Sequence, residues 1–125
     1  MPYKGGERLK YNLQLHRDTI LVVKLFGELG HHEIEKVRAN ISQTILSGQV
    51  RFVIWNMEYV QFMDSAGIGL ILGRMRELRA INGQMLILNP SETVQKIFQF
   101  AGLASFVRYI SEQEAIMQAG GILNG

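Results

Sequence analysis

Ser65 is the residue whose type and position could most directly carry chemistry. It lies in the segment Phe62-Met63-Asp64-Ser65-Ala66-Gly67, just before a stretch with helical periodicity. A hydrolase nucleophile elbow requires Gly-x-Ser-x-Gly, and Met63 occupies the first glycine position, so that pattern fails. Asp64 or Ser65 can cap the helix, since a side-chain oxygen accepts a free N–H of the first turn. Ser65 can equally be a phosphoacceptor, because a helix N-terminus favours negative charge.

The glycines of this helical stretch could suggest a nucleotide site. Gly67, Gly69 and Gly73 follow the spacing G-x-G-x-x-x-G, which is not the dinucleotide fingerprint, and no Gly-Lys-Ser/Thr follows them. These glycines therefore give little support to an NTPase, which is kept as one alternative. On a helical wheel Gly69 and Gly73 lie opposite an apolar face formed by Ile68, Ile71, Leu72, Met75 and Leu78. Glycine costs up to about 1 kcal/mol inside a helix. Two glycines on a solvent face indicate either a closely approaching partner or a tolerated weakness.

A metal site is the next possibility, at His31, His32, Glu33 and Glu35. The zincin motif requires His-Glu-x-x-His, and counting from His32 the final position is Lys36. The chain has no cysteine and its third histidine is distant. We therefore expect no metal site, and interpret these residues as the polar start of a helix.

Composition limits the remaining classes of function. The chain has 125 residues, 47% apolar and 19% charged, which fits one domain with a substantial core. Its net charge is only +2, and the densest basic stretch, Arg74 to Arg79, contains Glu77 and is typical of a solvated helix face. We expect no nucleic-acid partner. No secretory signal and no run of about 18 apolar residues is present, so we expect no membrane partner and a cytoplasmic protein.

The order of predicted elements is β-β-α-β-α-β-α-β-α. Strands are expected near 9–15, 19–26, 50–55, 84–88 and 106–110, with the first two forming a hairpin. Helices are expected near 34–45, 66–81, 91–102 and from 111 onward, the last opened by a capping box at Ser111. Residues 56–63 are predicted to be a loop. The pattern predicts one α/β domain over residues 9–119, with flexible ends at 1–8 and 120–125.

The segment from Phe62 to Met75 closely resembles the phosphorylation-site segment of anti-sigma factor antagonists, which are STAS-domain proteins, and above all those of sporulation that act on anti-sigma F factor. Further matching segments are Leu25 to Leu29, His31-His32, Asn89 to Ser91 and Val94 to Leu103. The resemblance covers about residues 9–119. It implies a mixed, mostly parallel sheet of about five strands with about four helices largely on one side.

The resemblance also implies a mechanism of partner switching. The unphosphorylated protein would bind an anti-sigma factor that is also a serine kinase, and so free the sigma factor. Phosphorylation at the position of Ser65 would end that complex, and a PP2C-type phosphatase would reverse it. The protein would be no enzyme, and ATP or ADP would belong to the kinase, so no cofactor is expected. The alternative is a STAS scaffold or ligand-sensing module of a stress-signalling complex.

Two positions depart from the pattern of these antagonists. Ala66 replaces a frequent second serine, which leaves Ser65 as the phosphoacceptor. Gly30 replaces the usual aspartate that assists partner recognition, so docking of the kinase could change. The resemblance implies a docking surface around Ser65 that comprises Gly30, His31, Asp64, Ala66, Gly67, Ile68, Gly69, Gly73 and Arg74.

Overall fold

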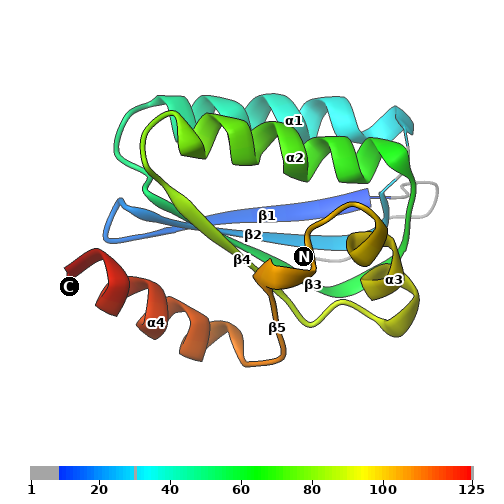
Figure 1. The fold of residues 1–125 in the computed structure, drawn as a ribbon. Helices are drawn as coiled ribbons and strands as arrows, with labels where there is room; N and C mark the ends of the chain where they lie inside the picture. The colour runs from blue at the N-terminus through cyan, green and yellow to red at the C-terminus, as the bar shows by residue number, and fades with distance from the viewer. Residues whose placement is uncertain (1–8, 30, 125) are drawn as a thin grey trace.

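A computed structural model describes residues 9–29 and 31–124, which form one sheet with helices on both of its faces (Figure 1). The predicted flexible residues 1–8 and the departure at Gly30 lie outside the described residues. The elements in chain order are β1 (Leu9–His16), β2 (Ile20–Leu29), α1 (His31–Leu46), β3 (Phe52–Met63), α2 (Ser65–Arg79), β4 (Gln84–Leu88), α3 (Glu92–Phe100), a 3₁₀ turn (Ala104–Phe106), β5 (Val107–Arg108) and α4 (Glu112–Asn124).

The five strands lie side by side in the order of the sequence, β1-β2-β3-β4-β5. β1 is antiparallel to β2, and each later pair is parallel. Arg17 and Asp18 join the first two strands with φ angles of 55° and 62°, the left-handed values of a tight hairpin turn. The predicted α/β class and mixed, mostly parallel sheet are therefore confirmed.

Alternate residues of the buried strands face two different layers. Leu21, Val23 and Leu25 of β2 point into the larger core, which α1 and α2 cover and to which α3 contributes. Ile20 and Val22 point to the opposite face, where Ala115 and Ala119 of α4 are fully buried. Figure 1 shows α1 and α2 over one face of the sheet and α4 below the other. Strands buried on both faces explain the nearly continuous apolar runs in the sequence.

The predicted loop at 56–63 is wrong, because β3 continues through it to Met63. Lys24 of β2 lies opposite Asn56, yet Phe26 lies opposite Tyr59, so β3 carries one extra residue there. A second irregularity lies between Gly27 and Glu28. Each extra residue shifts the alternation of side chains between the two faces. The period of two that identifies a strand is thereby lost from the sequence.

The C-terminal tail predicted to be loose from Gly120 is instead helical up to Asn124. Ala119 is buried and Leu123 packs against the same core, so the helix continues past its two glycines. The capping box is confirmed in its first half, since the Ser111 hydroxyl accepts the N–H of Glu114 at 3.0 Å. The strand predicted at 106–110 is shorter, Val107–Arg108, and follows a 3₁₀ turn.

Candidate functional site at the start of helix α2

Two strand-to-helix junctions lie at the same edge of the sheet. Leu29, the last residue of β2, lies opposite Met63, the last residue of β3. The Asp64 N–H donates to the Leu29 carbonyl at 3.5 Å, which ties the second junction to the first. α1 begins at His31 after one junction and α2 begins at Ser65 after the other. The sheet therefore supports the predicted grouping of the two segments, although Gly30 and the side chain of His31 lie outside the described residues.

Asp64, and not Ser65, caps helix α2. Its backbone is extended, and its carboxylate Oδ1 accepts the N–H of Ala66 at 2.8 Å. Ser65 is the first residue of the helix and is exposed to solvent. Of the two caps that the sequence allowed, the structure thus selects Asp64. The Ser65 hydroxyl has no capping role and is available to a partner.

The start of α2 offers fewer free donors than we expected for a phosphate on Ser65. Asp64 already engages the N–H groups of three residues: its carboxylate accepts from Ala66, and its carbonyl accepts from Gly67 at 3.1 Å and Ile68 at 3.3 Å. A phosphate on Ser65 would stand beside the Asp64 carboxylate. The positive end of the helix still attracts the phosphate, but the adjacent carboxylate repels it.

Gly67 is a packing residue. It is buried, and a Cβ built on it would lie 2.5 Å from the Met63 Cγ and 3.2 Å from the Leu29 Cβ. A side chain here would overlap the Met63 side chain, so either that side chain or the start of α2 would have to shift. Gly67 was predicted to belong to the docking surface, and the structure shows that its lack of a side chain serves the fold.

Gly69 and Gly73 have no such internal role. A Cβ on either glycine would meet nothing within 4 Å. Gly69 is exposed and Gly73 is half-buried, so this face of α2 presents backbone with no side chain over it. Ala66 and Ile68 beside them are half-buried and pack against the core. On α2, the predicted surface therefore presents the exposed Ser65 and, at Gly69 and Gly73, helix backbone that no side chain covers.

Arg74 is where the structure corrects the sequence most clearly. We predicted a solvated helix face at Arg74, Arg76 and Arg79. Arg76 and Arg79 are exposed, but Arg74 is only 6% exposed. The apolar face is also wider than predicted: Ile71 and Leu78 are buried as expected, and Leu70 is buried with Arg74. α2 is covered on its flank by α1 as well as below by the sheet (Figure 1).

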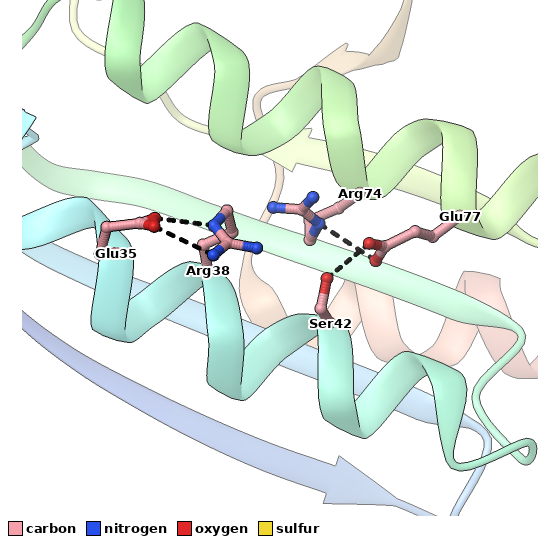
Figure 2. A network of polar contacts seen from close by, with 5 residues as sticks. All are labelled: Glu35, Arg38, Ser42, Arg74 and Glu77. Atoms are coloured by element: carbon pink, nitrogen blue, oxygen red, sulfur yellow. Dashed lines mark hydrogen bonds and ion pairs between the residues drawn. The ribbon is translucent and has the colours of Figure 1, made fainter.

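A polar network joins the two helices around Arg74 (Figure 2). The Arg74 Nε donates to the Glu77 Oε1 at 3.1 Å, and the Ser42 hydroxyl of α1 donates to the other oxygen of the same carboxylate. The Arg74 Nη1 is buried and has no partner among the described residues. Arg74 is thus held within the α1–α2 contact, and its side chain is not displayed for docking.

An exposed ion pair lies on α1 beside this network. The Arg38 guanidinium donates to both oxygens of Glu35, at 2.9 and 3.0 Å. This hydrogen bonding, together with the negative charges of Glu35 and Glu77, raises the pKa of Arg38. Sequence reasoning missed the whole network. The spacing of three residues in Glu35/Arg38 and Arg74/Glu77 was a signal for each pair, but nothing in the sequence linked Ser42 to Glu77.

The sequence profile of the STAS domain matches residues 13–115, which is most of the chain. The chain belongs to the STAS domain family. The matched range includes both strand-to-helix junctions and the Ser65 segment.

Several similar proteins are named as antagonists of anti-sigma factors. The chain is 47% identical over 117 residues to an anti-sigma F factor antagonist of Lysinibacillus sphaericus, covering 94% of this chain and 100% of the relative. Its fold matches the structure of the anti-sigma factor antagonist SpoIIAA in its unphosphorylated form, with a TM-score of 0.86, 48% identity, and coverage of 90% and 97% of the two chains. It also matches the Bacillus cell fate determinant SpoIIAA in the phosphorylated form, with a TM-score of 0.78, 48% identity, and coverage of 87% and 98%.

Proposed function

We propose that this protein is an anti-sigma factor antagonist whose partner binding is controlled by phosphorylation of Ser65. In its unphosphorylated form it binds an anti-sigma factor that is also a serine kinase, and the released sigma factor activates sporulation transcription. The observation that carries the proposal is the exposed Ser65 at the first position of α2, with the capping role taken by Asp64. A relative solved in phosphorylated and unphosphorylated forms supports it.

The docking surface proposed for the kinase is the exposed start of α2. Ser65 and Gly69 are exposed, and Asp64, Ala66, Ile68 and Gly73 are half-buried around them. Because Gly69 and Gly73 carry no side chain, a partner can approach the helix backbone closely. Gly30 and His31, whose side of the surface lies outside the described residues, are kept in the proposed surface on the sequence resemblance alone. Gly67 and Arg74 act from beneath, by holding α2 in place.

Phosphorylation switches this surface through charge. A phosphoserine adds about −1.5 to −2 charge at neutral pH. At Ser65 this charge would stand beside the Asp64 carboxylate, so the surface that docks the kinase becomes strongly negative. The phosphate then repels an acidic partner and obstructs a partner that packs closely on the helix. The core of the antagonist is unchanged.

The chain acts as a binding protein and substrate in this proposal, and not as an enzyme. The kinase supplies ATP, and a PP2C-type phosphatase restores the free hydroxyl, so the antagonist itself needs no cofactor. We place it in the cytoplasm, with no nucleic-acid or membrane partner. Within the part of the chain that the structure describes, no helix combines the length and apolar character that a membrane crossing requires.

Incubation with the cognate kinase and ATP tests the proposal by intact mass. The wild type should gain the mass of one phosphate, and Ser65→Ala should gain none. Ser105→Ala is the matched control, because Ser105 is also exposed but lies in the 3₁₀ turn, outside helix α2. Phosphate gained by Ser65→Ala would refute the assignment of Ser65. Ser65→Asp should bind the ADP-loaded kinase poorly, and tight binding would contradict the charge mechanism.

A further inference from the structure

The outer edge of strand β4 is covered only at the end of the strand. β5 pairs with β4 at Ile87 and Leu88. The 3₁₀ turn Ala104–Phe106 precedes β5, so no strand of the described residues extends this pairing toward the start of β4. Residues Gln84–Leu86 therefore have β3 on one side and an open edge on the other. An open strand edge can pair with a further strand.

The backbone groups of Met85 point to this open edge. The Gln84 N–H donates to the Arg51 carbonyl at 2.9 Å, on the side of β3. The Asn89 N–H donates to the Arg108 carbonyl at 3.1 Å, on the side of β5. Because the N–H and C=O groups of successive strand residues point alternately to the two edges, Met85 shares the direction of Asn89. Its N–H and C=O are thus directed into the space that β5 leaves unfilled.

A hollow of about 360 Å³ lies along the open edge and reaches both faces of the sheet. Met85 lines it from the larger core, and Leu86 lines it from the smaller core on the opposite face. Leu78 of α2 and Ile122 of α4 line it as well, and Figure 1 shows these two helices on opposite faces of the sheet. A strand sends alternate side chains to opposite faces, so an added strand fits a hollow of this form.

Two arginines give the hollow a positive charge. Arg79, the last residue of α2, and Arg108 of β5 both line it and are exposed. The Arg79 side chain has no hydrogen bond or ion pair with the described residues. Arg108 donates only to the carbonyls of Ser105 and Val107, each at 2.8 Å, which leaves its charge uncompensated within the same part of the chain.

The two charges lie on different faces of the sheet. Arg79 belongs to α2, whereas Arg108 lies opposite Leu88, which packs in the core that α4 covers. Among the described residues that line the hollow, none is acidic. The charge of the hollow is therefore complementary to a partner with acidic side chains.

We propose that the open edge of β4 binds an extended, acidic segment of a partner protein by strand addition. The backbone of Met85 bonds to the backbone of the segment, and apolar side chains of the segment enter the hollow on both faces. Acidic side chains near its ends pair with Arg79 and Arg108. This edge lies at the end of α2 away from Ser65, a helix length of roughly 21 Å, so the two surfaces can be occupied independently.

A second copy of the chain is the competing occupant. Two β4 edges paired about a two-fold axis would bring Arg79 and Arg108 of both copies into one groove. Like charges placed together across an interface oppose binding. The charge of this edge therefore favours an acidic partner over a second copy.

Peptide binding to the full chain tests the proposal. The probe is fluorescein-labelled Glu-Thr-Val-Val-Thr-Glu, the control peptide carries Lys in place of both Glu, and fluorescence anisotropy gives the two dissociation constants. The acidic peptide should bind at least about tenfold more tightly than the lysine peptide. Arg79→Glu should reverse this preference. Arg76→Glu is the matched control, because Arg76 is an exposed arginine of α2 that does not line the hollow, and it should retain the preference.

Hydrogen exchange at Met85, followed by NMR, reports whether the peptide adds as a strand. Saturating acidic peptide should slow exchange of the Met85 amide at least about tenfold. The Gln84 amide already donates to Arg51, so its exchange should stay unchanged. A bound peptide that leaves the Met85 amide unprotected would be held by charge alone, which overturns strand addition.

The remaining outcomes also decide the proposal. Absence of binding at about 1 mM acidic peptide overturns it. Equal affinities for the two peptides, or equal effects of Arg79→Glu and Arg76→Glu, overturn it because they show that the charge of the hollow is not used. Sedimentation of the chain without peptide tests the competing occupant. A concentration-dependent dimer in which the Met85 amide is protected would assign the edge to a second copy.

Discussion

The Glu77 carboxylate of α2 accepts a hydrogen bond from Ser42 of α1, while its other oxygen binds the buried Arg74. One carboxylate thus connects the two helices that begin at the candidate site. Because Arg74 is 6% exposed and its Nη1 has no partner among the described residues, Glu77 is the group that compensates its charge.

Glu77→Ala should therefore lower the free energy of unfolding by about 2–3 kcal/mol, since it leaves a buried cation without its ion pair. Glu35→Ala is the matched control: it breaks the same type of pair at the same spacing, but at the exposed Arg38, and should cost much less. The fluorescence of Trp55, the only tryptophan and fully buried, follows unfolding in urea. Equal losses in the two variants would contradict a special role for Glu77.

Gly67→Ala should destabilise the fold by about 1–3 kcal/mol, because the added methyl group would overlap the Met63 side chain beneath α2. The same urea titration measures the loss. Met63→Ala combined with Gly67→Ala should remove the clash, so the double variant should show a smaller loss than the sum of the two single ones. Additive losses would argue against the contact.

Gly69→Ala and Gly73→Ala should have the opposite effect on stability, each raising it by up to about 1 kcal/mol. No atom lies within 4 Å of the added Cβ, and alanine is the better helix former. If the kinase approaches the helix backbone here, the same variants should bind it more weakly. Surface plasmon resonance with the kinase and ADP separates the two effects, and unchanged binding would place the docking surface elsewhere.

Asp64→Ala should cost about 0.5–2 kcal/mol through loss of the cap on the Ala66 N–H, whereas Asp64→Asn should retain most of that stability. Asp64→Asn also removes the negative charge beside Ser65. The stability lost on phosphorylation of Ser65 should therefore be smaller in Asp64→Asn than in the wild type. Thermal unfolding of the two proteins before and after treatment with kinase and ATP gives the comparison.

Sequence periodicity, together with turn residues and helix-capping signals, was sufficient for the hairpin of β1 and β2 and for the existence of each helix. It failed at β3, where two extra residues destroy the alternation, and at Gly120, where a glycine pair lies inside a helix that the core still holds. These failures share a cause: tertiary packing on a neighbouring element overrides the local pattern.

The structure confirms the position of Ser65 at a helix start and changes the structural roles of several of its neighbours. Ser65 lies where its motif placed it, at the start of a helix. Its neighbours could not be assigned from spacing: Asp64 and Ser65 were equally good caps, and the burial of Arg74 depends on α1, which lies in a distant part of the sequence. Likewise, the packing role of Gly67 follows from its contact with Leu29 across the sheet.

The tight packing of Gly67 against Met63 and Leu29 also affects how a partner would recognise Ser65. The backbone that carries Ser65 is anchored directly on the buried ends of two strands, so it is preorganised before any partner arrives. Binding then requires little loss of conformational entropy at the serine. If Ser65 is phosphorylated as proposed, the phosphate would change the electrostatic potential of a rigid surface and leave its shape unaltered. The proposed switch would then act mainly on the dissociation rate of the complex.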